Sequence, residues 1–239
     1  MPSWLSSLLS PFTYPVSAAL AGAHRLVTGS GLDPASGLAW AASISMLVVA
    51  VRLVLLPVVV HHVRLSRAGG RGWLPLLLQT PVMFALFRVL MDVAAGVSTG
   101  LMTSSLVYSA RGAQVFGAGL WQSLSQVGDP GAAAVAAVLV ALTGAVTYAG
   151  NRFLTLANVP THALDGPAGQ AQRLMPALGA AVVAASGIAV PLGIVLYWLV
   201  GALWTAGQQF AINRWAPTPG SPADAARRTR QAGRRPARG

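Results

Sequence analysis

One arginine in this sequence stands where a positive charge is costly. Arg52 lies about fourteen residues into the apolar segment 38–60, and a charge inside a membrane span costs roughly 2.5 to 3.5 kcal/mol on insertion scales. Three explanations are open. Arg52 could form an ion pair with Asp92, or its side chain could extend to the nearer membrane interface. Alternatively, it faces a water-filled cavity, where it would attract an acidic group of a passing substrate.

Other polar residues of the apolar segments allow more local explanations. Arg88 and Asp92 are four residues apart, so they share a helix face and are expected to form a local ion pair. Thr205, Gln208 and Gln209 lie near the end of the last apolar segment. They either line the same cavity as Arg52 or mark the membrane interface, and both interpretations stay open.

The residues that enzymes use are not arranged for catalysis. No His-Glu-x-x-His sequence is present, and no glycine-rich phosphate loop follows a predicted strand. A rhomboid-like protease would need a histidine deep in a span, and none lies there. The chain has no cysteine, which excludes disulfides and thiolate metal sites. We therefore expect neither an enzyme nor a metal or cofactor.

The composition is that of a membrane protein. Of the 239 residues, 54% are hydrophobic and only 9% are charged, about a third of the ~25% typical of soluble domains. The net charge is +11, and every basic residue is an arginine. These arginines crowd the segment ends and the tail. They do not form a basic face with interleaved aromatic residues, which argues against nucleic-acid binding.

Five apolar segments are expected to cross the membrane as helices. A helix needs about 20 residues to span a hydrocarbon core of ~30 Å. Four segments reach this length, and the fourth in order is shorter and rich in alanine and glycine. The expected spans are residues 38–60, 73–93, 131–150, 174–190 and 192–213. Residues 94–130 are rich in glycine and serine and are expected to form an extramembrane loop.

Residues 1–37 are expected to form an extracytoplasmic segment with one helix. Over residues 15–28, an apolar face repeats at helical spacing through Val16, Leu20, Ala23 and Val27. Polar residues fall on other faces, namely Ser17, His24 and Arg25. This pattern predicts an amphipathic helix on the membrane surface, and an additional span is the alternative.

The arginines predict the orientation. Twelve lie in the two loops after the first and third spans and in the tail, whereas only Arg25 and Arg111 lie on the opposite side. The positive-inside rule then places the N-terminus outside and the C-terminus in the cytoplasm. Residues 214–239 are expected to form a disordered basic tail. Contacts with anionic lipid or a ribosome are expected for Arg227, Arg228, Arg230, Arg234 and Arg235.

Several stretches resemble one known family, the YidC, Oxa and Alb-type membrane protein insertases in their actinobacterial form. They are YPVSAALAGAH, SGLAWAASISMLVVAVRLVLLPVVV, LPLLLQTPVMFALFRVL, GLWQSLSQVGDP and PLGIVLYWLVGALWTAGQQFAINR. Together they cover most of residues 14–214. The last stretch, with its Tyr-Trp and Gln-Gln pairs, is the most specific.

The resemblance implies an all-α membrane fold in which five transmembrane helices enclose a hydrophilic groove. The groove is open to cytoplasm and lipid and closed to the outside. Arg52 would be its charge, and Gln79 and Thr80 of the second core span would line it with Thr205, Gln208 and Gln209. Such a groove takes the hydrophilic end of an inserting protein while the apolar segment passes into lipid.

The implied partners are nascent or newly made membrane proteins, together with a Sec-type translocon and a ribosome. The implied location is the bacterial cell membrane, and no cofactor or small-molecule substrate is expected.

One departure from the family pattern opens alternatives. The family has a long charged helical hairpin between the first two core spans, but only HHVRLSRAGGRG lies there in this chain. A specialised paralogue that serves as a folding scaffold is therefore one alternative. A small-solute channel or transporter is another, although no inverted repeat is found and only one charge lies firmly inside a span.

Overall fold

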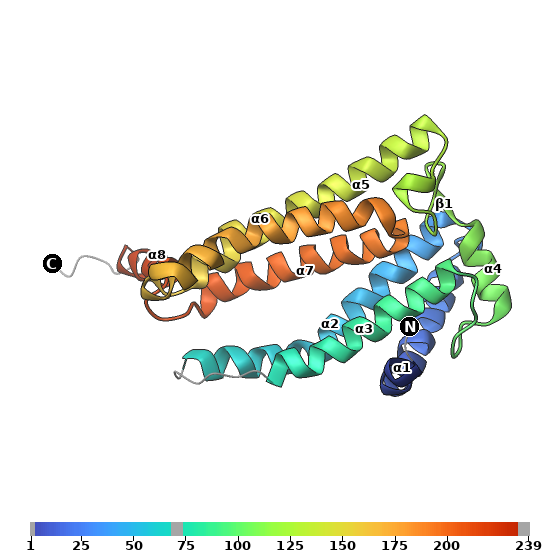
Figure 1. Cartoon of the computed structure of the whole chain (residues 1–239). Coiled ribbons are helices and arrows are strands. Elements are labelled where there is room, and N and C mark those ends of the chain that lie inside the picture. The colour runs from blue at the N-terminus through green and yellow to red at the C-terminus, as the bar shows by residue number, and fades with distance from the viewer. Residues whose placement is uncertain (1–2, 68–73, 234–239) are drawn as a thin grey trace.

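The computed structural model describes residues 3–67 and 74–233, and these are almost entirely helical (Figure 1). The long helices are α1 (Ser3–Gly29), α2 (Gly37–Arg67), α3 (Leu74–Ala94), α5 (Pro130–Ala149), α6 (Gly166–Ala189) and α7 (Leu192–Trp215). The shorter elements are α4 (Ser104–Gly112), β1 (Gln114–Val115), β2 (Ala118–Gly119), η1 (Leu124–Gln126), the π-helical η2 (Gly150–Thr155), η3 (Leu156–Asn158), η4 (Thr161–Leu164) and α8 (Pro222–Ala232).

The long helices run back and forth between two ends of the molecule. Helices α5, α6 and α7 lie side by side, and α7 also packs against α2. Helix α1 packs against α2 and α3, at the end opposite to α8 (Figure 1). The C-terminal ends of α2, α5 and α7 therefore lie on one side of the molecule, together with α8 (Figure 1).

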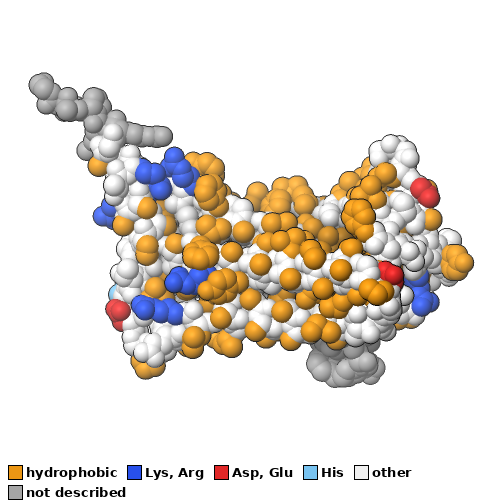
Figure 2. All heavy atoms as spheres, turned by 90° about the horizontal axis from the view of Figure 1, so that it is seen from above, with side chains coloured by type: hydrophobic (Ala, Val, Ile, Leu, Met, Phe, Trp, Pro, Cys, Tyr) orange, Lys and Arg blue, Asp and Glu red, His pale blue; other side chains and the backbone are white. Residues whose placement is uncertain are grey.

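The surface between these two ends is apolar. Figure 2 shows hydrophobic side chains along the middle of the molecule, with arginines gathered toward the ends. Large apolar side chains are exposed there, including Val54 at 77%, Val138 at 65% and Val182 at 64%. Exposed apolar area of this extent is typical of contact with lipid.

Within the described residues, three helices are long and apolar enough to cross a membrane: Gly37–Leu65, Pro130–Asn158 and Gly166–Ala189. The prediction of an all-α membrane protein is therefore confirmed. The second and fifth expected spans correspond to α3 and α7, which form helices but are not among these three. Five crossings remain a prediction.

The helices extend beyond the apolar segments that predicted them. Helix α2 continues from the expected end at residue 60 to Arg67, and α6 begins at Gly166 rather than residue 174. Apolar composition marks only the part of a helix inside hydrocarbon, because backbone hydrogen bonding continues into the polar interface. Helix α5 begins one residue before the expected start at residue 131. Asp129 accepts a hydrogen bond from the Ala132 N–H at 2.7 Å, and Pro130 follows it.

The expected amphipathic helix over residues 15–28 is part of α1, and its predicted apolar face is buried. The polar residues differ from expectation, because Ser17 and His24 are only 0% and 3% exposed. The Ser17 hydroxyl accepts a hydrogen bond from the Leu101 N–H at 3.1 Å. The His24 ring stacks on Trp40 with centroids 3.9 Å apart. Helix α1 is therefore packed against protein on two faces, which a single sequence stripe does not reveal.

The loop of residues 94–130 contains α4, β1, β2 and η1, and it holds the start of α7. The Leu192 N–H donates to the Gln122 carbonyl at 2.9 Å, and the Gly193 N–H donates to that of Leu120. A Cβ atom on Gly193 would lie 3.2 Å from the Trp121 ring. Only a glycine therefore allows this close approach without displacing the ring.

The prediction of a disordered tail from residue 214 is wrong over residues 214–232. Helix α7 continues to Trp215, and α8 forms after a short turn. Ser221 caps α8, since its hydroxyl accepts from the Asp224 N–H at 3.2 Å, and Pro222 occupies the first turn. A low apolar content hid these local helix signals. Arg234 and Arg235 lie outside the described residues.

Candidate functional site

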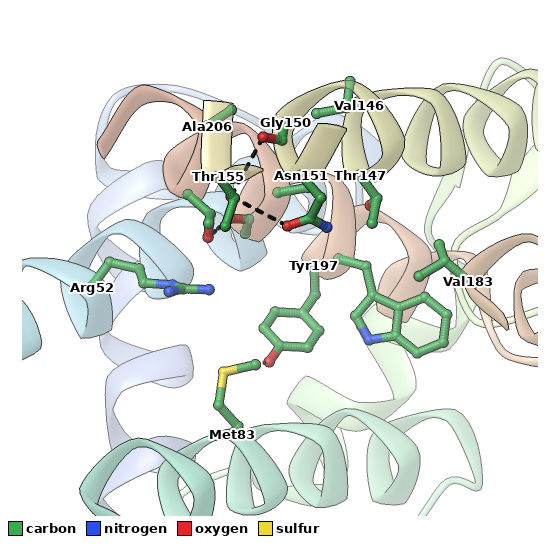
Figure 3. Close-up of a pocket in the computed structure, with 14 residues that line it drawn as sticks. Arg52, Met83, Val146, Thr147, Gly150, Asn151, Thr155, Val183, Tyr197 and Ala206 are labelled. Atoms are coloured by element: carbon green, nitrogen blue, oxygen red, sulfur yellow. Dashed lines mark hydrogen bonds between the residues drawn. The ribbon is translucent and has the colours of Figure 1, made fainter. Parts of the chain in front are cut away.

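Arg52 lines a cavity of about 250 Å³ to which six helical elements contribute. Helix α2 provides Arg52 and α3 provides Met83. Helices α5, η2 and α6 form the facing wall, and α7 contributes the remaining lining residues, from Tyr197 to Ala206. The polar side chains of the lining are Arg52, Thr147, Asn151, Thr155, Tyr197 and Thr205. Figure 3 shows Arg52, Tyr197, Asn151 and Thr155 around one shared space.

The ion pair between Arg52 and Asp92 is not formed. Asp92 accepts from the Arg88 Nε at 2.7 Å and from the Thr99 hydroxyl at 2.9 Å, so both carboxylate oxygens already have partners. The predicted local pair of Arg88 and Asp92 is confirmed. In the described part of the chain, no carboxylate lies within ion-pair distance of Arg52.

A glycine on α7 makes room for the guanidinium group. A Cβ atom built on Gly201 would lie 3.5 Å from the Arg52 Nη2, so the charge lies directly against the α7 backbone. Tyr197 is one turn earlier on α7, and its hydroxyl donates to the Met83 sulfur at 2.9 Å. Helices α2, α3 and α7 are thus joined around the charged end of the cavity.

The facing wall carries a polar stripe that the sequence analysis missed. Thr147, Asn151 and Thr155 are spaced four residues apart, on one face of α5 and its continuation η2. The Thr155 hydroxyl donates to the Gly150 carbonyl and the Asn151 Oδ1, both at 3.4 Å. η2 is a π-helical turn, which often marks a functional site. The four-residue spacing across the end of the apolar segment 131–150 was the available signal.

The structure brings only one of the three polar residues predicted near the end of the last span to Arg52. Thr205 lines the cavity, and its hydroxyl donates to the Gly201 carbonyl at 2.8 Å. Gln208 instead lines a separate hollow between α2 and α7, beside Arg64, and accepts from the Trp204 ring N–H at 3.2 Å. Gln209 donates to Asn213 at 2.9 Å.

Neither of the two groove residues expected on α3 is confirmed. Thr80 is half-buried on α3 and is not among the described residues that line the cavity around Arg52. The side chain of Gln79 lies outside the described residues.

One further sequence pattern proves to have no catalytic setting. Residues 96–100 have the spacing Gly-x-Ser-x-Gly, but a nucleophile elbow requires a strand before the serine and a helix directly after it. Here the segment connects α3 to α4. The Ser98 hydroxyl lies 3.1 Å from that of Ser104. The segment is a loop between helices.

The arrangement suits binding rather than bond cleavage. Arg52 carries the single formal charge among the described residues that line the cavity, and the other polar groups are hydroxyls and one amide. Such a lining offers hydrogen-bond partners and one positive charge to a polar or acidic group.

Residues 68–219 match the protein family described as 60Kd inner membrane protein. The chain belongs to this family. The matched range contains α3, α5, α6 and α7, and it begins after Arg52.

Relatives of the chain carry the same kind of name. It is 32% identical over 267 residues to a "Membrane protein insertase YidC" of Streptomyces avermitilis, covering 93% of this chain and 62% of that protein. It is 27% identical over 279 residues to a protein of the same name from Tropheryma whipplei strain Twist, covering 95% of this chain and 90% of that one. The resemblance predicted from the sequence motifs is therefore confirmed.

The chain spans less than two thirds of the length of the Streptomyces relative. No solved structure matches it significantly.

Proposed function

We propose that this member of the 60Kd inner membrane protein family is a membrane protein insertase whose substrates are nascent or newly made membrane proteins. The observation that carries the proposal is the cavity around Arg52, in which one charge and five neutral polar side chains lie among membrane-type helices. The names of the relatives support the same activity.

Insertion requires that a hydrophilic tail pass an apolar layer about 30 Å thick. A polar cavity part-way across shortens the apolar path, because the tail exchanges bulk water for hydroxyls, an amide and a cation. Arg52 attracts an acidic tail most strongly. The apolar segment of the substrate meanwhile moves into lipid along the exposed apolar surface of the helices. We propose that the five core helices, residues 38–213, enclose this route as a groove open to the cytoplasm.

The proposed location is the bacterial cell membrane, as a multi-pass protein with the N-terminus outside and the C-terminus in the cytoplasm. The arginines support this orientation. Arg64 and Arg214 lie in the last turns of α2 and α7, and Arg227 lies on α8. Arg25 lies near the end of α1 and Arg111 on α4, and both helices are at the end opposite to α8 (Figure 1). The positive-inside rule assigns the richer end to the cytoplasm.

The short connection between α2 and α3 bears on how substrates arrive. Only residues 68–73 separate these helices, which leaves no length for a helical hairpin. We propose that substrates reach the cavity directly from the membrane interface, by themselves or with help from a Sec-type translocon or a ribosome. A folding scaffold for proteins inserted by other machinery is the competing function.

Reconstitution tests the proposal. The purified chain in liposomes is given a single-span reporter with a short acidic tail, and protease protection of the tail is measured beside empty liposomes. Protection that requires the protein establishes an insertase that works alone. Protection equal to that of empty liposomes refutes autonomous insertion and favours the scaffold. Solute flux through the same liposomes without insertion would instead indicate a channel.

A further inference from the structure

Two adjoining hollows at the junction of α7 and α8 differ in chemistry and share two arginines. The first, the basic hollow, has a volume of about 240 Å³ and is lined by Arg214, Trp215, Arg227, Arg230 and Gln231. The second, the apolar hollow, has a volume of about 290 Å³. Its lining includes Leu154, Ala157, Phe210 and Ala226, together with Arg214 and Arg230.

The basic hollow concentrates positive charge. In the described part of the chain, no carboxylate lies within ion-pair distance of Arg214, Arg227 or Arg230. Arg228, on the same helix, differs because it pairs with Asp224 at 2.8 Å. Three guanidinium groups around one hollow repel each other, and a phosphate placed between them would accept several charge-assisted hydrogen bonds.

The apolar hollow identifies the class of ligand. Phe210 is 58% exposed on α7, and Leu154 faces the same hollow from η2. Trp215, which is 67% exposed, ends α7 and lines the basic hollow, and tryptophan is enriched at membrane interfaces. A ligand that fills both hollows must combine a phosphate with an apolar chain. A phospholipid carries both parts on one molecule, whereas a nucleic acid would place a base, and not an aliphatic chain, against Phe210 and Leu154.

We propose that the α7–α8 junction binds an anionic phospholipid. The phosphate lies among Arg214, Arg227 and Arg230, and an acyl chain lies along Phe210 and Leu154. Bound in this way, the lipid links α8 to the end of α7 and holds the basic helix at the membrane interface. This proposal does not depend on the insertase function, because none of these residues lines the cavity around Arg52.

Lipid binding to the full-length chain in neutral detergent micelles tests the proposal. Native mass spectrometry measures the affinity for phosphatidylglycerol and for phosphatidylcholine with the same chains. We expect a clear preference for phosphatidylglycerol. The double variant Arg214→Gln/Arg230→Gln should lower that affinity about 25-fold, at about fivefold for each arginine near an anionic group. Arg228→Gln removes the same charge from a paired position and should leave the affinity unchanged.

The apolar half is tested with a second pair of variants on one helix. Phe210→Ser should weaken phosphatidylglycerol binding, whereas Leu203→Ser should not, since Leu203 is exposed on α7 but lines neither hollow. Melting temperature and gel filtration establish that each variant is folded, and Arg214→Lys/Arg230→Lys should retain most of the binding.

Three results would overturn the proposal. An equal loss in Arg228→Gln would indicate general attraction to negative charge. Binding of glycerol phosphate as tight as that of the lipid would indicate a phosphate pocket without an acyl site. The third result is an RNA oligonucleotide that binds the wild-type chain more tightly than the lipid does and loses affinity in the double variant to the same extent as the lipid. That result would identify a nucleic-acid surface instead.

Discussion

Replacing Arg52 with alanine tests two effects of this charge separately: its effect on the stability of the protein and its effect on insertion activity. The wild-type chain carries this charge in a span without an ion-pair partner among the described residues. Its removal should leave the fold intact and raise stability by at most about 3 kcal/mol, the cost on insertion scales. A stability gain with a loss of activity would identify the charge as functional.

The expected loss of activity follows from Coulomb's law. An acidic tail about 6 Å from the guanidinium gains about 0.7 kcal/mol at the dielectric constant of water and about 3 kcal/mol at an effective value of about 20. These energies correspond to about threefold and about 100-fold in the population of the bound tail. The wetter the cavity, the closer the effect lies to the lower value.

The assay is protease protection of a single-span reporter in liposomes. Reporters with an acidic tail and with a neutral tail of the same length are compared in wild type and Arg52→Ala. Arg152→Ala serves as the matched control, because Arg152 is exposed and lines no part of the cavity. Arg52→Lys keeps the charge and should retain most of the activity.

Two outcomes would refute the reasoning about Arg52. If the folded Arg52→Ala variant inserts the acidic reporter as well as wild type, the charge does not receive the tail. If the neutral reporter is lost to the same extent as the acidic one, the side chain maintains the shape of the cavity and the Coulomb argument does not apply.

Further predictions concern Gly201, Asp129 and Asp224. Gly201→Ala should retain insertion activity, because a Cβ atom 3.5 Å from Arg52 Nη2 is in ordinary contact. Gly201→Leu should displace the guanidinium group and reduce insertion in the same assay. Equal insertion by the two variants would contradict this packing. Asp129→Ala should lower stability by about 1 kcal/mol through loss of the N-cap of α5, measured by thermal unfolding against Asp129→Asn, which keeps an acceptor. The Arg228 side chain, which donates a hydrogen bond to Asp224, lowers the pKa of that carboxyl group below its usual value. A lowered pKa means that α8 keeps this stabilisation above the pKa of the unfolded chain and loses it as pH falls through the folded value. Hydrogen exchange of the α8 backbone amides should therefore become faster as the pH falls. In the Arg228→Gln variant this increase should begin at a higher pH. An identical pH dependence in wild type and variant would refute the pairing.

Local features of this protein were readable from the sequence because each depends on neighbours along the chain. Asp129 and Pro130 mark the start of α5, and the four-residue spacing of Arg88 and Asp92 gives their ion pair on one helix face. Apolar runs predicted the long helices, and Arg52 stood out because a charge there is costly. Even the stripe of Thr147, Asn151 and Thr155 is encoded in a four-residue spacing along the chain.

What surrounds Arg52 was decided by the packing of separate helices. Thr205 and Gln208 lie less than one turn apart on α7, yet only Thr205 lines the cavity, because the orientation of α7 against α2 and α5 directs each face. Ser17 and His24 look like surface residues in sequence and are buried because loop and helix pack against them. Periodicity identifies the faces of one helix, but which faces meet depends on contacts between residues far apart in the chain.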